Sequence, residues 1–301
     1  MHLDPKVSRV LGIIGILIAG ALAVYIAYLY VKPHGSSEAL IPPDTRLVLS
    51  ASDLPAHDAL IIGMSHKSLA PVNIPSQGTQ NIYAEALGKN YAYYLISGPM
   101  AGESTLYRLD QKHPEAGLEQ LTQSNSEKLD LSVHEAAGLA VFAAQVNGKP
   151  HVVVLDMKSG KETDLGEGVH PHILAAGLNV LFEKNGSLVS EEIASGKIYP
   201  LAKIAPAAPF AVDAFKSQFA LYDSAANAVK TYLIVNDATA AQEASSGVPG
   251  EKPDALLYSG DTLLMARMVQ DMLVVSSIDG LHDEQIRAPG FSLMGFSIHV
   301  L

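Results

Sequence analysis

Two stretches of this chain repeat each other, and that repeat limits the fold more than any other feature of the sequence. Between short apolar runs such as "LAVFAA" and "NVLFE", both stretches carry three marks in the same order. The marks are a glycine (Gly138, Gly177), an Asn-Gly pair (147–148, 185–186) and a Ser-Gly-Lys triplet (159–161, 195–197), 36 to 39 residues apart. Apolar runs broken by such residues are typical of strands joined by hairpin turns. Asn-Gly favours a type I′ turn, in which both central residues have positive φ.

Weaker copies of the pattern extend over most of the chain. They lie at 57–75, 88–111, 216–237 and 260–280, so second strands are expected to begin near residues 59, 90, 139, 178, 217 and 262. A spacing of about 40 residues with four strands per unit is typical of a β-propeller, in which each small sheet buries its faces against its neighbours. The sequence therefore predicts an all-β propeller over residues 45–301, with about six blades in a range of five to seven.

The two ends of this region are predicted to share one blade. Residues 46–51 and 291–301 are both strand-like, and pairing them would close the ring. No long helical pattern follows residue 44. The polar, alanine-rich segment 238–255 is expected to be a long loop between strands.

The repeat unit resembles that of the TolB-like, WD40-like propeller family. In "AGLAVFAAQVNGKPHVVVLDMKSGKETDL" an apolar strand follows a glycine, and the next strand ends in Asp-x-x-Ser-Gly-Lys. The Ser-Pro-Asp-Gly turn that is usual in the family is replaced by "HEAAG" at 134–138 and "HILAAG" at 172–177. The resemblance implies a propeller fold and no particular ligand, because propellers carry many unrelated functions.

The segment before the repeats is predicted to be a membrane anchor. Residues 10–31 carry no charge and, at about 1.5 Å per residue, would span about 33 Å as a transmembrane α-helix. Residues 1–9 would then be a short cytoplasmic tail and residues 32–44 a tether. A cleaved signal peptide is the alternative, although its apolar region would be shorter.

Basic residues and tyrosines predict the orientation of this anchor. Lys6 and Arg9 precede it, whereas Lys32 alone follows it, and the positive-inside rule therefore places the N-terminus in the cytoplasm. The propeller would lie on the periplasmic or extracytoplasmic side of the cytoplasmic membrane; a cytoplasmic body is the alternative. Membrane-interface positions are predicted for Tyr25, Tyr28 and Tyr30 at the outer end of the helix.

A stripe of small residues on the anchor predicts helix packing. Gly15, Ala19, Ala23 and Ala27 recur every four residues and would share one helix face. Small side chains let two helix backbones approach closely in lipid. The expected partners are the lipid bilayer and other membrane or envelope proteins, or a second copy of this chain.

Charge and composition exclude several function classes. The net charge is −11, and because residues 1–32 contribute +2, the remainder carries −13. Such a body is expected to be repelled by nucleic acid and by anionic lipid surfaces. The absence of cysteine excludes disulfides, thiolate nucleophiles and zinc–thiolate sites.

No catalytic or cofactor motif is complete. "GMSHK" (63–67) is not a nucleophile elbow, and "HEAAG" lacks the second histidine of a zincin helix. "HPH" (170–172) could bind a metal with Glu167 or Asp164 as a third ligand, but a polar loop between blades is the expected structure. Glu135, Glu183 and Asp223 occupy similar places in successive units and could converge on a central channel. We expect no cofactor and no enzyme activity.

These features predict a single-pass membrane protein of the cell envelope that binds proteins, as a scaffold or accessory subunit of a larger membrane complex. One alternative is a small-ligand sensor or propeller enzyme with its site in the central channel. The other is a structural envelope protein that associates with itself.

Overall fold

A computed structural model describes one compact unit of the chain, within residues 40–301. The predicted tail 1–9, transmembrane helix 10–31 and tether 32–44 lie outside the described residues. Among the residues that are described, no helix has the length and hydropathy needed to cross a membrane. The described residues are 45–51, 59–63, 70–72, 82–97, 100, 102–124, 126–174, 177–206, 208–213, 216–236, 238–247, 249, 251–259, 262–270, 272–278, 283–287 and 293–300.

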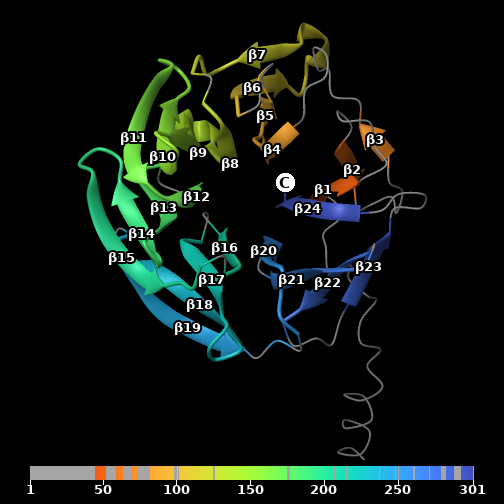
Figure 1. Cartoon of the computed structure of the whole chain (residues 1–301), viewed down its shortest axis with the longest axis vertical. Helices are drawn as coiled ribbons and strands as arrows, with labels where there is room; N and C mark the ends of the chain where they lie inside the picture. The colour runs from red at the N-terminus through yellow and green to blue at the C-terminus, as the bar shows by residue number, and fades with distance from the viewer. Residues whose placement is uncertain are drawn as a thin grey trace, which may run out of the picture. The chain divides into compact units, whose positions relative to one another are not determined.

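Six four-stranded antiparallel sheets form a β-propeller (Figure 1). Each sheet runs from a strand near the centre to a strand at the periphery, and we number these blades 1 to 6 in chain order. Blade 1 contains β24 (Leu293–Val300), β1 (Thr45–Ala51), β2 (Ala59–Gly63) and β3 (Ala70–Val72). Blade 2 contains β4 (Ile82–Leu87), β5 (Tyr91–Ser97), β6 (Ser104–Asp110) and β7 (Leu118–Gln120); blade 3 contains β8 (Lys128–His134), β9 (Leu139–Val146), β10 (Lys149–Asp156) and β11 (Lys161–Glu167).

Blades 4 to 6 follow the same order from the centre outward. Blade 4 contains β12 (Val169–Ile173), β13 (Asn179–Lys184), β14 (Ser187–Glu192) and β15 (Lys197–Lys203); blade 5 contains β16 (Phe210–Asp213), β17 (Gln218–Asp223), β18 (Ala228–Val235) and β19 (Ala240–Gly247); blade 6 contains β20 (Ala255–Ser259), β21 (Thr262–Val269), β22 (Met272–Ser277) and β23 (Asp283–Arg287). Among the described residues two single 3₁₀ turns, η2 (Pro114–Ala116) and η3 (Glu135–Ala137), accompany the strands. The predicted all-β propeller is confirmed, and five of the six predicted second strands begin within one residue of the expected position. The strand at residue 59 exists, but it is the third strand of its blade.

Both ends of the described unit meet in blade 1. β1 pairs antiparallel with β24, with Thr45 opposite Val300 and Leu47 opposite Ile298. β24 is the strand nearest the centre, and it also contacts β20 and β22 of blade 6. The predicted sharing of one blade by the two ends is therefore confirmed.

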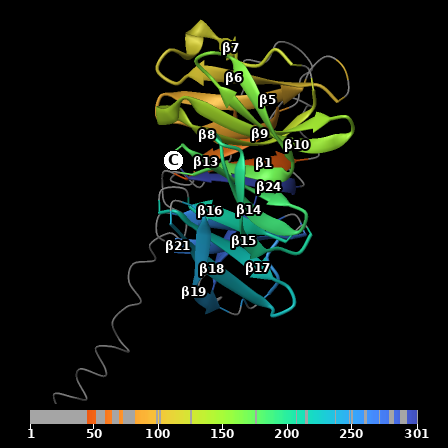
Figure 2. The same cartoon turned by 90° about the vertical axis from the view of Figure 1, so that its left-hand side faces the viewer.

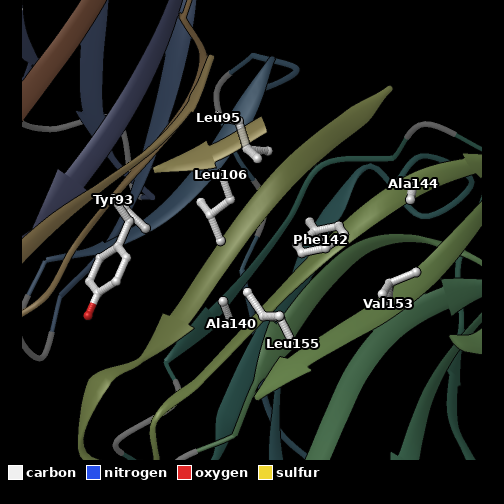
Figure 3. Close-up of a cluster of buried hydrophobic side chains, with 9 residues drawn as sticks. Tyr93, Leu95, Leu106, Ala140, Phe142, Ala144, Val153 and Leu155 are labelled. Atoms are coloured by element: carbon white, nitrogen blue, oxygen red, sulfur yellow. The ribbon is translucent and has the colours of Figure 1, made fainter. Parts of the chain in front are cut away.

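Apolar clusters between successive blades form the core. Figure 3 shows Tyr93, Leu95 and Leu106 of blade 2 near Ala140, Phe142 and Leu155 of blade 3, and all six are buried. Similar clusters join blades 3 and 4, 4 and 5, and 5 and 6. Because a second strand such as β5 faces a neighbouring blade on both sides, its sequence is a continuous apolar run, "YAYYLI", rather than an alternating one.

Tight turns hold the strands in register. Asn147 (φ 53°) and Gly148 (φ 78°) join β9 to β10, and Asn185 (φ 51°) and Gly186 (φ 72°) join β13 to β14. Both pairs have positive φ at both central residues, which confirms the predicted type I′ geometry.

The predicted loop at 238–255 is wrong, because β19 (Ala240–Gly247) lies within it and pairs with β18. β19 is the outermost strand of blade 5, and most of its side chains are exposed. A strand exposed on both faces needs no apolar alternation, so the sequence pattern that identifies buried strands is missing from it.

A buried lysine joins blades 2 and 3. The side chain of Lys128 is fully buried, and its Nζ donates hydrogen bonds to the carbonyl oxygens of Ser104 (2.8 Å), Ser124 (2.6 Å) and Ser126 (3.0 Å). Three donated bonds require the charged ammonium form. Burial lowers the pKa of Lys128 to about 8, and the nearby Glu162 carboxylate opposes this shift. At neutral pH the ammonium therefore persists and connects β6, the link between the blades and β8.

We expect Lys128→Met to lower the free energy of unfolding by about 2–4 kcal/mol, because one buried and two partly buried carbonyl groups lose their donor. The pKa of lysine in an unfolded chain is about 10.4, so between pH 8 and 10.4 the unfolded wild type binds more protons than the folded one. The stability of the wild type should therefore rise with pH in this window, relative to the variant.

Urea unfolding of the full chain in mild detergent, followed by circular dichroism because the chain has no tryptophan, measures this difference. Lys149→Met is the control, since this exposed lysine pairs with the exposed Glu167 and should change stability by less than about 0.5 kcal/mol. Equal stability of the two variants would show that the buried ammonium contributes nothing.

Candidate functional site

The innermost strands of blades 3, 4 and 5 bring together the most distinctive polar side chains of the described ring. His170, Pro171 and His172 lie in β12, so the predicted loop at "HPH" is wrong. A proline is tolerated there because β12 pairs with β13 on one side only and needs no N–H on the other. Because two of its five residues are histidines, β12 lacks the apolar pattern that identifies a buried strand in the sequence.

Two of these innermost strands contain a bulge. Pairing shifts between Leu129 and Leu131 in β8, and between Val169 and His172 in β12. Asp130 and His170 both have a φ of 52° in these interruptions. A bulge leaves one residue outside the ladder and changes the direction of its side chain. The backbone N–H of His170 donates a hydrogen bond to Asp130 Oδ2 (3.2 Å), which connects the two bulges across the blade boundary.

Phe210 of β16 completes the cluster from blade 5. Its ring centroid lies 6.0 Å from that of His170 and 5.6 Å from that of His172, with interplanar angles of 78° and 76°. Both imidazoles therefore meet the phenyl ring in edge geometry. The Nδ1 atom of His170 lies 3.6 Å from Glu183 Oε2, close enough for an ion pair when the histidine is protonated.

The two histidines differ in environment. Burial, together with the charge of nearby His170, lowers the pKa of His172 to about 4. At neutral pH the His172 ring is therefore uncharged and has one donor and one acceptor nitrogen. His170 is about half exposed and lies near two carboxylates, Asp130 and Glu183. The cluster thus combines the neutral imidazole of His172, the half-exposed imidazole of His170, two acids and an aromatic ring, which together could bind a small polar ligand.

The candidate metal ligands have other partners. Asp164 Oδ2 lies 2.9 Å from His151 Nδ1, and Glu167 accepts a hydrogen bond from Lys149 (2.5 Å). Across the described part of the chain, no three His, Asp or Glu side chains are arranged to hold a metal ion.

The three acids expected to converge lie in different surroundings. Glu135 accepts hydrogen bonds from the backbone of Asn90 (3.1 Å), whereas Glu183 lies beside His170. Asp223 pairs with Lys230 (2.7 Å) at the turn between β17 and β18. The described structure does not bring them together as one acidic site.

The site residues predicted in the anchor lie outside the described residues and stay predictions: Gly15, Ala19, Ala23, Ala27, Tyr25, Tyr28, Tyr30, Lys6 and Arg9. Sequence reasoning missed Asp130, Phe210 and Lys128. In two successive units a polar residue lies between apolar ones at the same place, in "LDL" (129–131) and "VHP" (169–171). This match was the signal in the sequence that could have indicated the two bulges.

Comparison with known proteins supports the fold. No protein-family model matches the sequence, and no curated protein matches it. TolB from Acinetobacter baumannii has a TM-score of 0.60 at 14% identity, over 86% of this chain and 68% of TolB. A chain of the nidogen/laminin complex has a TM-score of 0.57 at 12% identity, over 85% of this chain and 98% of that one. Oligogalacturonate lyase in complex with manganese has a TM-score of 0.52 at 12% identity, over 82% and 80%.

These similarities identify a TolB-like β-propeller fold and no more. At 12–14% identity the likeness concerns the backbone alone, and the three proteins are of different kinds. Residues of the cluster in blades 3 to 5 must therefore be assigned a role on their own geometry.

We expect the stability of the wild type to fall by about 2–3 kcal/mol as pH falls from 6.5 to 4, through His172 alone. Its folded pKa lies below the unfolded value of about 6.5, so the unfolded chain binds more protons in this window. His172→Gln should remove this loss, whereas His113→Gln, at an exposed turn, should not. Urea midpoints at pH 7 and pH 4.5 give the comparison; the same acid loss in His172→Gln and wild type would contradict it.

Proposed function

We propose that the protein is a membrane-anchored propeller on the extracytoplasmic side of the cytoplasmic membrane, and that it binds proteins as a scaffold or accessory subunit of a larger membrane complex. The observation that carries this proposal is the closed ring, in which β24 and β1 join the two ends of the described unit. A sheet ring closed in this way presents turns at both ends on an unbroken support.

Packing between blades makes such a support suitable for docking. Apolar clusters join blades 2 to 6 in succession, and short turns connect their strands. Turns held by a packed core lose little conformational freedom when a partner binds, so less of the binding free energy is spent on ordering them. The propeller folds of TolB and of the chain from the nidogen/laminin complex are consistent with such a role.

The anchor supplies confinement and a second contact. In this proposal residues 1–9 lie in the cytoplasm, 10–31 span the bilayer, and 32–44 tether the propeller. Lys6 and Arg9 set the orientation, and Tyr25, Tyr28 and Tyr30 lie at the outer interface. The stripe of Gly15, Ala19, Ala23 and Ala27 packs against a helix of the partner complex.

A second candidate function has one specific observation in its favour. The cluster of Asp130, His170, His172 and Phe210 lies on innermost strands, where a ligand in the central channel would bind. A sensor of a small polar molecule, or an enzyme centred there, would use these side chains. Self-association through the anchor is the third candidate.

The test is purification of the full chain from native membranes in mild detergent, with chemical cross-linking and mass spectrometry. We expect a stoichiometric set of membrane proteins, cross-linked both to the anchor and to the propeller turns. Recovery of the chain by itself as a monomer would overturn the scaffold function. It would favour instead a small-ligand function for the cluster of Asp130, His170, His172 and Phe210.

The anchor stripe gives a matched pair of variants. Ala19→Leu inserts a bulky side chain into the stripe, whereas Ala21→Leu makes the same change on the opposite helix face. We expect the first to lower recovery of the partner complex at least severalfold and the second to leave it unchanged. If Ala19→Leu abolishes only self-association, the structural alternative holds; equal recovery of both variants would mean that the stripe faces lipid.

A further inference from the structure

The innermost strands of four successive blades each contain a bulge near their start. The pairing of β24 with β1, of β4 with β5, of β8 with β9 and of β12 with β13 shifts by one residue. In every case the extra residue belongs to the innermost strand and lies among its first four residues. Asp130 in blade 3 and His170 in blade 4 lie at these interruptions, and both have a φ of 52°. The innermost strands of blades 5 and 6 pair without such a shift.

These four bulges lie at one end of the centre of the ring. Every innermost strand follows the outermost strand of the preceding blade, so all six begin at the same end. Figure 1 shows them around the centre, and Figure 2 shows the ring from the side. Bulges change the direction of a side chain and are common next to active sites. Their repetition in adjacent blades makes this end, which we call the bulged end, a candidate binding site.

The acid that blade 4 contributes to the bulged end faces blade 5. Neighbouring residues of a strand point to opposite faces, so Glu183 and Lys184 of β13 do so as well. The ammonium of Lys184 lies 5.8 Å from the ring centroid of Phe182, which packs in the cluster between blades 3 and 4. Glu183 shares the other face with Leu181, which packs in one cluster with Phe219 of blade 5. The lysine next to Glu183 is therefore turned away from this site.

Two carboxylates at the bulged end lack a basic partner. In the described part of the chain neither Asp130 nor Glu183 forms an ion pair with a lysine or an arginine. Lys128 is close to Asp130 in the sequence, but its ammonium is enclosed by three carbonyl oxygens. Both carboxylates are only partly buried, so a ligand can reach them. Their charge attracts a cation and repels an anion.

The rings beside these carboxylates favour an organic cation over a metal ion. The imidazoles of His170 and His172 and the phenyl ring of Phe210 lie within 6.0 Å of one another in the two pairs that Phe210 forms. An ammonium compound gains from ring faces as well as from carboxylates, because the ring quadrupole attracts the cation. No three His, Asp or Glu side chains among the described residues are arranged to hold a metal ion.

We propose that blades 3 to 5 form, at the bulged end, a binding site for a small organic ammonium compound. Its ammonium group pairs with Asp130 and Glu183, and its carbon chain contacts Phe210 and His172. The inference names the ligand class that the second candidate function leaves open, and it does not depend on the scaffold function. The charge and the carbon chain of the ligand should both contribute to binding.

The test compares three four-carbon compounds that differ in charge: butylammonium, 1-butanol and butyrate. Saturation-transfer NMR of each compound is recorded with the full chain in dodecyl maltoside micelles, and empty micelles give the blank. We expect the dissociation constant of butylammonium to be at least about tenfold lower than that of 1-butanol, because hydrogen bonds between charged groups are stronger than neutral ones. Butyrate should give no signal above the blank. Equal binding of butylammonium and 1-butanol would overturn the proposal.

Matched variants show which charges act. Asp130→Asn and Glu183→Gln remove a charge but keep the shape of the side chain, and the first keeps an oxygen that can accept the N–H of His170. Each should weaken butylammonium binding at least about fivefold, and Phe210→Leu about threefold. Glu243→Gln is the control, since it makes the same change on the exposed outermost strand of blade 5 and should leave binding unchanged. Circular dichroism shows whether each variant is folded.

One outcome of these variants separates the site from a general effect of the acidic body. If Asp130→Asn and Glu183→Gln bind butylammonium as the wild type does, the cation is attracted by the net charge of the whole chain, and the proposal is overturned. Because the three-compound series needs no variant, it decides the question even if one of these variants does not fold.

A second probe separates a small compound from a lysine of a bound protein, which carries the same ammonium group. This probe is a tripeptide with blocked ends and a lysine between two glycines. Binding that is equal to or weaker than that of butylammonium supports the small compound, whereas tighter binding would overturn it in favour of a protein side chain. None of these measurements uses a partner complex, so failure of the scaffold function in the cross-linking test leaves their outcome unaffected.

Discussion

The pairing of β1 with β24 is the contact on which the rest of the ring depends. Blades 2 to 6 bury apolar faces against one another, and a propeller whose ring stayed open would leave one face of each terminal blade in water. The paired residues lie about 250 positions apart, but the entropy of closing a loop grows only with the logarithm of its length. The apolar packing between successive blades from 2 to 6 favours the compact ring over that modest cost.

The sequence predicted the turns and strands whose local residue pattern matches their environment in the fold. Asn-Gly at 147–148 and 185–186 gave the turns, because few other residues adopt positive φ twice in succession. Apolar runs gave the second strands of blades 2 to 6, such as β5 and β9, whose side chains are mostly buried. β19 was missed because most of its side chains are exposed, so its sequence lacks the apolar residues by which a buried strand is recognised.

The candidate site was harder to predict for a different reason. A bulge adds one residue to a strand without changing its composition. The sequence around Asp130 and His170 therefore does not indicate that these residues have positive φ. The neighbours of a polar residue decide its role, and Phe210, Ser104 and Glu183 are distant in sequence from the residues they meet. In the sequence Lys128 cannot be distinguished from a surface lysine, because the three carbonyl groups that accept its hydrogen bonds come together only in the folded chain.

Ring closure by opposite ends also sets the timing of synthesis. β1 is made early, but its partner β24 emerges about 250 residues later, a delay of roughly 12–50 s at about 5–20 residues per second. Throughout that interval the nascent ring has an unpaired edge that another chain could join. A cell that makes this protein in quantity must therefore protect an incomplete ring until its last eight-residue strand arrives.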